Sequence, residues 1–307
     1  MKKMMAFITK VLRLPGVEEF MTLLYLKIPS ITSIFSKNVI NKKYGKTKRF
    51  VVETHGVNVV FSMEDFYSRF WLYARCDRGK IHEENVTKLL VESLKSSKCF
   101  VDVGANIGYY TFLASKIVSD GAIYAFEMDE LNYSLLEKNL KLNGCKNVHI
   151  FHAAITDSPG VVSYIGDSKH PSPMFSLSAG SLQVKSDQVI SVQAFTLDDF
   201  FKDKKSTPDV IKIDVEGAEM KVLNGMQNIL KNSKVKLFVE VHPIQLLLKF
   251  QSSANAVILM LINKGYSVFE VTNMRGRGKE IGLKKLNRDT RLMRNTMLYA
   301  LRKETSH

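Results

Sequence analysis

Two short stretches place glycines and carboxylates where they could bind a ligand. The first reads VDVGANIG from Val101 to Gly108. Gly104 and Gly108 allow a sharp turn and a close backbone approach, and the helix expected after them presents unpaired N–H groups. The second stretch, YAFE, ends at Glu127, where an acidic side chain at a strand tip can accept both hydroxyls of a ribose. The two stretches together predict a nucleoside-binding site.

Asp102 and the glycine spacing indicate which nucleoside the site binds. A dinucleotide fingerprint needs three glycines in the pattern G-x-G-x-x-G, whereas this chain has only G-x-x-x-G. A carboxylate at Asp102 would repel a pyrophosphate but suits a cationic amino group. S-adenosylmethionine carries such a group and no phosphate, so we favour it over NAD. In the alternative, purely structural interpretation, Asp102 caps a helix and Glu127 lies in a solvated turn.

A second group of carboxylates lies in IKIDVEGAE, where Asp214 ends a strand and Glu216 begins the next helix. The carboxyl ends of parallel strands are where doubly wound folds bind their ligands. Asp214 or Glu216 could take a proton from an acceptor hydroxyl, or could bind a divalent cation together with Glu240. Alternatively, Glu216 and Glu219 only stabilise a helix N-terminus through its dipole.

His242 and Asp157 complete the candidate residues. Because side chains alternate along a strand, Glu240 and His242 should share a face, and an imidazole there is a candidate general base near neutral pH. A lone histidine before proline could equally cap the strand. Asp157 follows a third strand, where contacts to adenine are expected, although it could simply form the turn that continues into Ser158-Pro159-Gly160.

The segments that must position these residues alternate between strand and helix, which is typical of a parallel sheet built from βα units. Strands are predicted at 99–103, 122–126, 148–151, 210–213, 235–241, 266–271 and 296–301. Helices are predicted near 108–117, 130–142, 217–230 and 244–263. An inserted or antiparallel pair is expected at 161–165 and 189–195, joined by a Ser/Pro-rich loop at 168–181.

The chain before residue 96 has a different pattern. The β-favouring run from Phe50 to Phe61 surrounds His55-Gly56 and predicts a hairpin. Aromatic residues at 66–73 and a helix at 81–94 follow. We therefore divide the chain into a helical and hairpin accessory region at 1–95 and a core domain at 96–307.

Composition favours a soluble globular protein, with 45% hydrophobic and 24% charged residues. The net charge of +14 is concentrated at the ends: residues 1–50 contribute +9 and residues 271–307 contribute +7. These ends could meet anionic lipid, glycan phosphate or nucleic acid, or could only aid solubility. No uncharged run is long enough to cross a bilayer, although residues 20–35 could lie on a membrane or pack on the core.

The motifs, in their order along residues 99–299, resemble the FkbM family of methyltransferases. They are VDVGANIGYYTFLASKIVSDGAIYAFEMDELNYSLLEKNLKLNG, FHAAITD, SL at Ser181-Leu182, TLDDF, PDVIKIDVEGAEMKVLNGM and VEVHP. The resemblance implies a class I methyltransferase, Rossmann-like α/β fold, with a mostly parallel seven-stranded sheet and helices on both faces. It also implies S-adenosylmethionine as methyl donor and O-methylation of a sugar, glycan or small-metabolite hydroxyl.

Position by position, the resemblance assigns Asp102, Gly104, Asn106 and Gly108 to the donor-binding loop and Glu127 to the ribose-binding acid. The residue after that acid is Met128, where the family commonly has proline. The N-terminal hundred residues lie outside the resemblance.

Two other functions remain as alternatives. An RNA ribose 2′-O-methyltransferase could use the same core and the basic ends, although the Asn/Asp-Pro-Pro-aromatic motif of base methylation is absent. The second alternative is a non-catalytic protein that binds the donor or a partner. Three cysteines without metal-like spacing suggest the cytoplasm. Peripheral membrane contact through the basic N-terminus is a further expectation.

Overall fold

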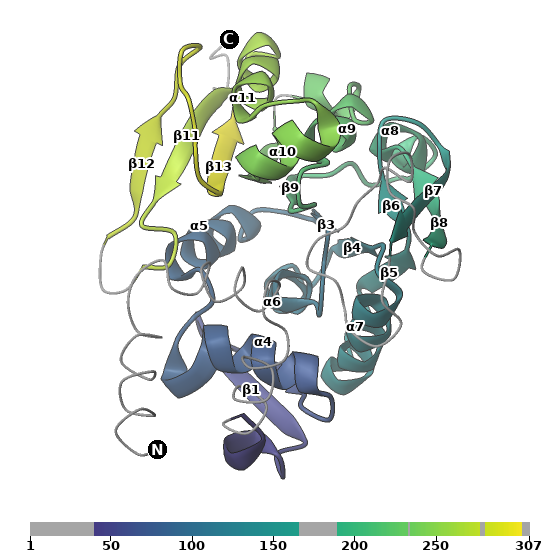
Figure 1. Ribbon diagram of the computed structural model, residues 1–307, viewed down its shortest axis with the longest axis vertical. Coiled ribbons are helices and arrows are strands. Elements are labelled where there is room, and N and C mark those ends of the chain that lie inside the picture. The colour runs from purple at the N-terminus through teal and green to yellow at the C-terminus, as the bar shows by residue number, and fades with distance from the viewer. Residues whose placement is uncertain (1–39, 166–188, 233, 277–279, 303–307) are drawn as a thin grey trace.

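The computed structural model describes residues 40–165, 189–232, 234–276 and 280–302 (Figure 1). The arm at 20–35, expected either to pack on the core or to lie on a membrane, the loop at 168–181 and the Ser181-Leu182 motif lie outside these residues. Within them the largest feature is an eight-stranded sheet. Its strands, in spatial order, are β12 (Gly282–Lys285), β11 (Ser267–Thr272), β13 (Thr296–Leu301), β10 (Lys236–Val241), β9 (Val210–Ile213), β3 (Cys99–Val103), β4 (Ala122–Glu127) and β5 (Val148–His152).

The seven predicted strands are confirmed, and the five from β10 to β5 run parallel. β13 inserts antiparallel between β10 and β11. The predicted count of seven is one too low, because β12 adds a short antiparallel edge to β11. Its sequence, GLKK, is mostly exposed and therefore carries little apolar signal.

Helices cover both faces of the sheet, as predicted (Figure 1). Alternate strand residues supply two separate cores: Phe100 and Phe238 belong to one, whereas Val101 and Val239 belong to the other. The first core includes residues of α5 (Glu84–Leu94), α6 (Tyr109–Ile117) and α7 (Glu130–Asn143). The second includes residues of α8 (Leu197–Phe201), α9 (Glu219–Asn224), α10 (Pro243–Phe250) and α11 (Ala254–Asn263).

Two helix predictions were wrong in extent. The helix predicted at 217–230 is only the six residues of α9, followed by a 3₁₀ turn at Ile229–Lys231. The single helix predicted at 244–263 is two helices, α10 and α11, bent by 97°. Gln251 ends α10 in the left-handed conformation, and Ser253 caps α11 by accepting a hydrogen bond from Ala256 N. No single described helix is long and apolar enough to span a membrane, and only the bent α10–α11 pair meets those criteria jointly.

The described part of the accessory region shares a core with the sheet domain. The predicted hairpin is β1 (Arg49–Thr54) and β2 (Val57–Ser62), and α4 (Phe66–Cys76) carries the aromatic cluster. Ser62 N donates to Oδ1 of Asn139, a fully buried residue of α7, at 2.8 Å. Phe61 and Leu72 are buried in the same core as α6. The accessory region is therefore packed where it can contribute to the site.

The inserted segment forms a second, smaller sheet. Its strands β7 (Gly160–Ile165) and β8 (Val189–Phe195) pair antiparallel, as predicted. A two-residue strand, β6 (Ala154–Ile155), adds to β8 in parallel. This small sheet follows directly after β5, and Ala153 N donates to Glu127 O at the end of β4.

Candidate active site

The loop between β3 and α6 packs directly onto the ends of its neighbouring strands. Gly104 and Gly108 both have positive φ angles, of 80° and 92°. A Cβ atom on Gly104 would lie 1.9 Å from the carbonyl oxygen of Asp214, so only glycine permits this approach. Gly104 N and Ala105 N both donate to Phe126 O at the end of β4. The loop thus joins the carboxyl ends of β3, β4 and β9.

Glu127 braces this loop from the end of β4. Its Oε2 accepts a hydrogen bond from Asn106 N at 2.7 Å, and its Oε1 accepts one from Asp129 N at 2.9 Å. Burial raises the pKa of Glu127 to about 7. Asn106 also donates through Nδ2 to the Tyr67 hydroxyl at 3.0 Å, so α4 of the accessory region contacts the loop.

Asp102 faces the protein interior. Its Oδ2 accepts from the Thr111 hydroxyl at 2.7 Å, and its Oδ1 lies 3.7 Å from Lys212 Nζ on the neighbouring strand. Only 1% of Asp102 is exposed. Lys212 also lies 3.4 Å from Asp214 Oδ2, so its ammonium group bridges two carboxylates. The charge of Asp102 is balanced by Lys212, and the predicted contact of Asp102 with a cationic ligand stays a prediction.

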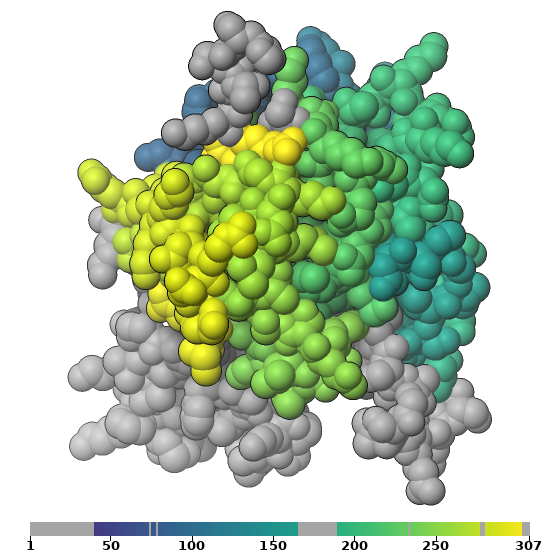
Figure 2. Space-filling model, turned by 90° about the horizontal axis from the view of Figure 1, so that it is seen from above, coloured from purple at the N-terminus to yellow at the C-terminus, as the bar shows by residue number. Residues whose placement is uncertain are grey.

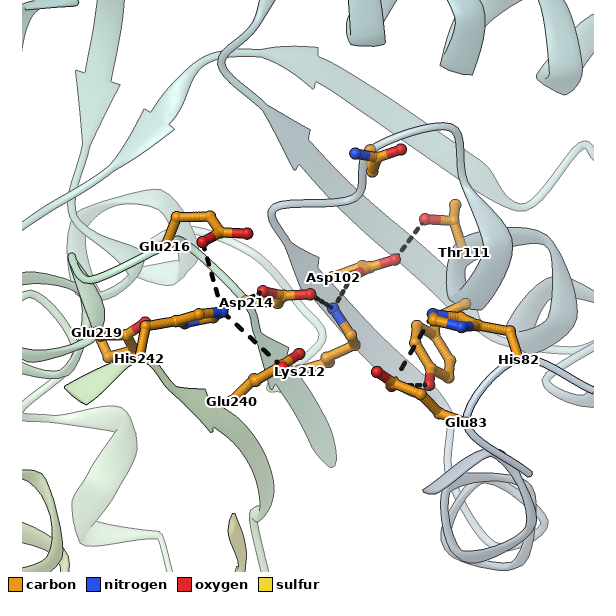
Figure 3. A network of polar contacts seen from close by, with 12 residues as sticks. His82, Glu83, Asp102, Thr111, Lys212, Asp214, Glu216, Glu219, Glu240 and His242 are labelled. Carbon is orange, nitrogen blue, oxygen red and sulfur yellow. Dashed lines mark hydrogen bonds and ion pairs between the residues drawn. The ribbon is translucent and has the colours of Figure 1, made fainter. Parts of the chain in front are cut away.

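His242 stands at the centre of a carboxylate cluster (Figure 3). Its Nδ1 lies 2.7 Å from Oε1 of Glu219, a fully buried carboxylate that fixes the orientation of the ring. Its Nε2 faces three more carboxylates, at 3.6 Å from Glu216, 3.8 Å from Asp214 and 3.9 Å from Glu240. The predicted catalytic residues therefore come together from β9, β10 and the turn before α9.

The charges in this cluster are unevenly compensated. Burial opposes ionisation of Asp214, yet the Lys212 ammonium and His242 hold its pKa below the ordinary value. Burial raises the pKa of Glu240 well above its usual range, and the charges of Asp214 and Glu83 add to this. Burial also raises the pKa of Glu216, to about 7. The site therefore carries more carboxylates than its two cationic side chains can balance.

The same excess of carboxylates acts on His242. Burial alone would lower its pKa, but Glu216, Glu219 and Glu240 raise it well above the ordinary value. These carboxylates favour the protonated imidazole, and its use as a base requires a further positive charge that lowers this pKa.

The sequence predicted no catalytic or binding role for three residues of the site. Lys212 lies within a buried strand, opposite Asp102 in register, and a lysine in that setting is an available signal. Glu219 was considered only as a helix-terminal charge. Glu83 precedes α5 and accepts a 2.7 Å hydrogen bond from the Tyr110 hydroxyl. No local pattern marks Glu83, because only the packing of the accessory region brings it near the cluster.

The contacts of Asp157 do not connect it to the carboxylate cluster around His242. It follows β6 and accepts hydrogen bonds from Lys221 Nζ at 3.0 Å and from the Thr156 hydroxyl at 3.0 Å. Burial would raise the pKa of Asp157, but the Lys221 and Thr156 hydrogen bonds lower it. Its predicted contact with adenine stays a prediction.

A glycine loop braced by a strand-end acid, beside carboxylates at the ends of parallel strands, defines a Rossmann-like nucleoside-binding fold. The model of the methyltransferase FkbM domain matches residues 102–268, which are more than half of the chain. The protein belongs to the FkbM methyltransferase family, as the motifs indicated, and S-adenosylmethionine is the donor expected for it.

Curated relatives are methyltransferases. The hexuronic acid methyltransferase AglP of Haloferax volcanii is 27% identical over 161 residues, which are 52% of this chain and 62% of that protein. The methyltransferase sdnD of Sordaria araneosa is 26% identical over 163 residues, covering 44% of this chain and 63% of that protein. The chain thus spans less than two thirds of the length of these relatives.

Solved structures resemble the chain more distantly. A methyltransferase FkbM from Methylobacillus flagellatus KT has 18% identity and a TM-score of 0.42, covering 66% of this chain and 43% of that one. A SAM-dependent methyltransferase from Agrobacterium tumefaciens has 12% identity and a TM-score of 0.44, covering 82% and 69%.

Proposed function

We propose that this protein transfers a methyl group from S-adenosylmethionine to a hydroxyl of a sugar, glycan or small metabolite. The observation that carries this proposal is the cluster of under-compensated carboxylates around His242, next to the glycine loop. A sulfonium donor brings the positive charge that the cluster lacks. Similarity to the hexuronic acid methyltransferase AglP of Haloferax volcanii supports a sugar acceptor.

In this proposal the loop from Gly104 to Gly108 and Glu127 hold the donor nucleoside. Asp214, kept ionised by Lys212, faces the sulfonium centre and orients it. His242, positioned by Glu219, accepts the proton of the acceptor hydroxyl once the bound donor has lowered its pKa. Methyl transfer itself needs only in-line approach of that oxygen to the methyl carbon.

Transfer of labelled methyl groups tests the function. The full chain is incubated with tritiated S-adenosylmethionine and, in separate reactions, hexuronic acid-containing glycans, neutral sugars and RNA. Label in a glycan or sugar is the expected result. Label in RNA alone would instead support the ribose 2′-O-methyltransferase, and failure to bind the donor would contradict both.

We expect Glu127→Ala to weaken donor binding by roughly 10- to 100-fold, because the substitution removes a charge-assisted hydrogen bond to the ribose hydroxyls. Removal of the carboxylate also frees the Asn106 and Asp129 amides that it braces. Isothermal titration calorimetry measures the change. Glu53→Ala, an exposed acid on β1, is the matched control. Equal affinities for wild type and Glu127→Ala would remove Glu127 from the donor site.

We further propose that the cluster can hold a divalent cation. The ligating atoms of Asp214, Glu240 and His242 all lie within 4.8 Å of one another. The hydrogen bond of His242 Nδ1 to Glu219 resembles the outer-shell carboxylate that orients many metal-binding histidines. Because His242 would then be a ligand, this is an alternative to its role as base: a cation bound there would help to ionise the acceptor hydroxyl in place of His242.

Mn²⁺ is a suitable probe, because carboxylates bind it readily. At a hundredfold excess over Kd, we expect it to stabilise the folded protein by about 2.7 kcal/mol in a thermal unfolding assay. The effect should grow as pH rises, because the metal must displace the proton of His242. Glu240→Gln should abolish it. Equal stabilisation of wild type and Glu240→Gln, or none, would refute the cation site.

A further inference from the structure

Helix α10 exposes an apolar face beside the candidate active site. Ile244, Leu247 and Leu248 are 62%, 63% and 75% exposed. Their spacing of three and four residues places them on one side of the helix. In the rest of the described chain, large exposed hydrophobic side chains occur only singly in any element or loop. We call these three residues the α10 face.

The opposite flank of α10 belongs to the site. Leu246 is fully buried, and Gln245 Nε2 lies 3.4 Å from Glu216 Oε2. His242 is the N-cap residue of the helix. Any surface that covers the α10 face therefore lies next to the catalytic cluster.

The segment that joins β12 to β13, residues 286–295, lies beside this helix in both views (Figures 1 and 2). Asn255 at the start of α11 donates to the carbonyls of Arg288 and Thr290 at 2.9 Å, which fixes the segment against the start of α11, four residues after the end of α10. Met293 in this segment is 85% exposed. The segment contains three arginines, Arg288, Arg291 and Arg294, against one acid, Asp289, and Arg294 also pairs with Glu270 of β11 at 3.1 Å.

An apolar helix face next to arginines matches an anionic lipid surface, where apolar side chains enter the interface and arginines meet headgroup phosphates. A second copy of the chain fits less well, because a two-fold contact would bring these arginines against those of the other copy. We propose that the α10 face, with Met293 and the arginines of 286–295, docks the protein on anionic phospholipid membranes. This docking presents the active-site edge of the sheet to the bilayer.

Flotation with lipid vesicles tests this proposal without requiring methyl transfer. The full chain should float with vesicles of phosphatidylcholine and phosphatidylglycerol, and far less with pure phosphatidylcholine. Leu247→Ser/Leu248→Ser should reduce the bound fraction about tenfold. Arg288→Glu/Arg291→Glu should remove the dependence on phosphatidylglycerol. Val161→Ser, at a residue that is 67% exposed on β7, is the matched control and should float as wild type does.

Unchanged donor binding by Leu247→Ser/Leu248→Ser shows that this variant is folded. The proposal is overturned if wild type does not float, or if Leu247→Ser/Leu248→Ser and Arg288→Glu/Arg291→Glu both float as well as wild type. It is also overturned if substitution of Lys2, Lys3 and Lys10 by Glu abolishes flotation while these two variants retain it. A different result would assign the α10 face to a second copy of the chain. In that case wild type would form concentration-dependent dimers and not bind vesicles, and Leu247→Ser/Leu248→Ser would abolish the dimers.

Discussion

Asp214→Asn is expected to lower kcat/KM for methyl transfer by about 10²–10³-fold, the scale seen when one electrostatic group at a reacting centre is lost. Asparagine keeps the shape of the side chain but removes the charge that Lys212 holds in place. Donor affinity should change little, because loss of the Asp214 charge lowers the raised pKa values of Glu216 and Glu240, which can then carry negative charge in its place. Steady-state kinetics and calorimetry on the same preparation separate the two effects.

Asp209→Asn is a matched control for this variant. Asp209 precedes β9 at the opposite edge of the sheet, where its Oδ2 accepts from the amides of Lys98 and Cys99. Its substitution should leave turnover at the wild-type level. A turnover of Asp214→Asn close to wild type would remove Asp214 from the reacting centre.

Lys212→Met is expected to cost about 3–5 kcal/mol of folding free energy, because it leaves buried carboxylates without their counter-charge. Lys212 is 3% exposed and bridges Asp102 and Asp214. Methionine preserves most of the side-chain volume, so the loss reports on charge rather than on packing. Urea unfolding followed by circular dichroism measures it.

Lys221→Met provides the comparison. Lys221 pairs with Asp157 at 3.0 Å, but 41% of its side chain is exposed. A pair in that setting contributes at most about 1 kcal/mol. If Lys212→Met destabilises the protein no more than Lys221→Met does, the buried bridge is not an important part of the fold.

The strands were predictable because each is a short apolar run between turn residues, and β3, β9 and β13 have the predicted bounds. The break between α10 and α11 was not, because apolar residues on both sides of it continue a helical pattern. Ser253, which caps α11, was the available signal. β12 was missed because it lies at the edge of the sheet and most of its residues are exposed, so its sequence has no apolar pattern to mark it.

The sequence was sufficient to predict the site residues that lie at strand ends, because each of these strand ends carries its own acidic residue. Asp214, Glu216, Glu240 and His242 meet because parallel strands β9 and β10 end at one edge of the sheet. The contribution of Glu83 depends on how the accessory region packs over α6, which no local pattern encodes. The sequence also suggested that Asp102 meets the ligand, whereas its described partners are Lys212 and Thr111.

Proton release on donor binding tests most directly whether the carboxylate cluster faces the sulfonium. Burial and neighbouring carboxylates hold the pKa of Glu216 near 7 and raise that of Glu240, and neighbouring carboxylates raise the pKa of His242 against the effect of burial, so the protonated forms of these groups are favoured. A bound cation lowers all three pKa values. Calorimetry in buffers of different ionisation enthalpy should show proton release with S-adenosylmethionine, and less with uncharged-sulfur S-adenosylhomocysteine. Equal release with both, or none, would contradict this assignment of the site.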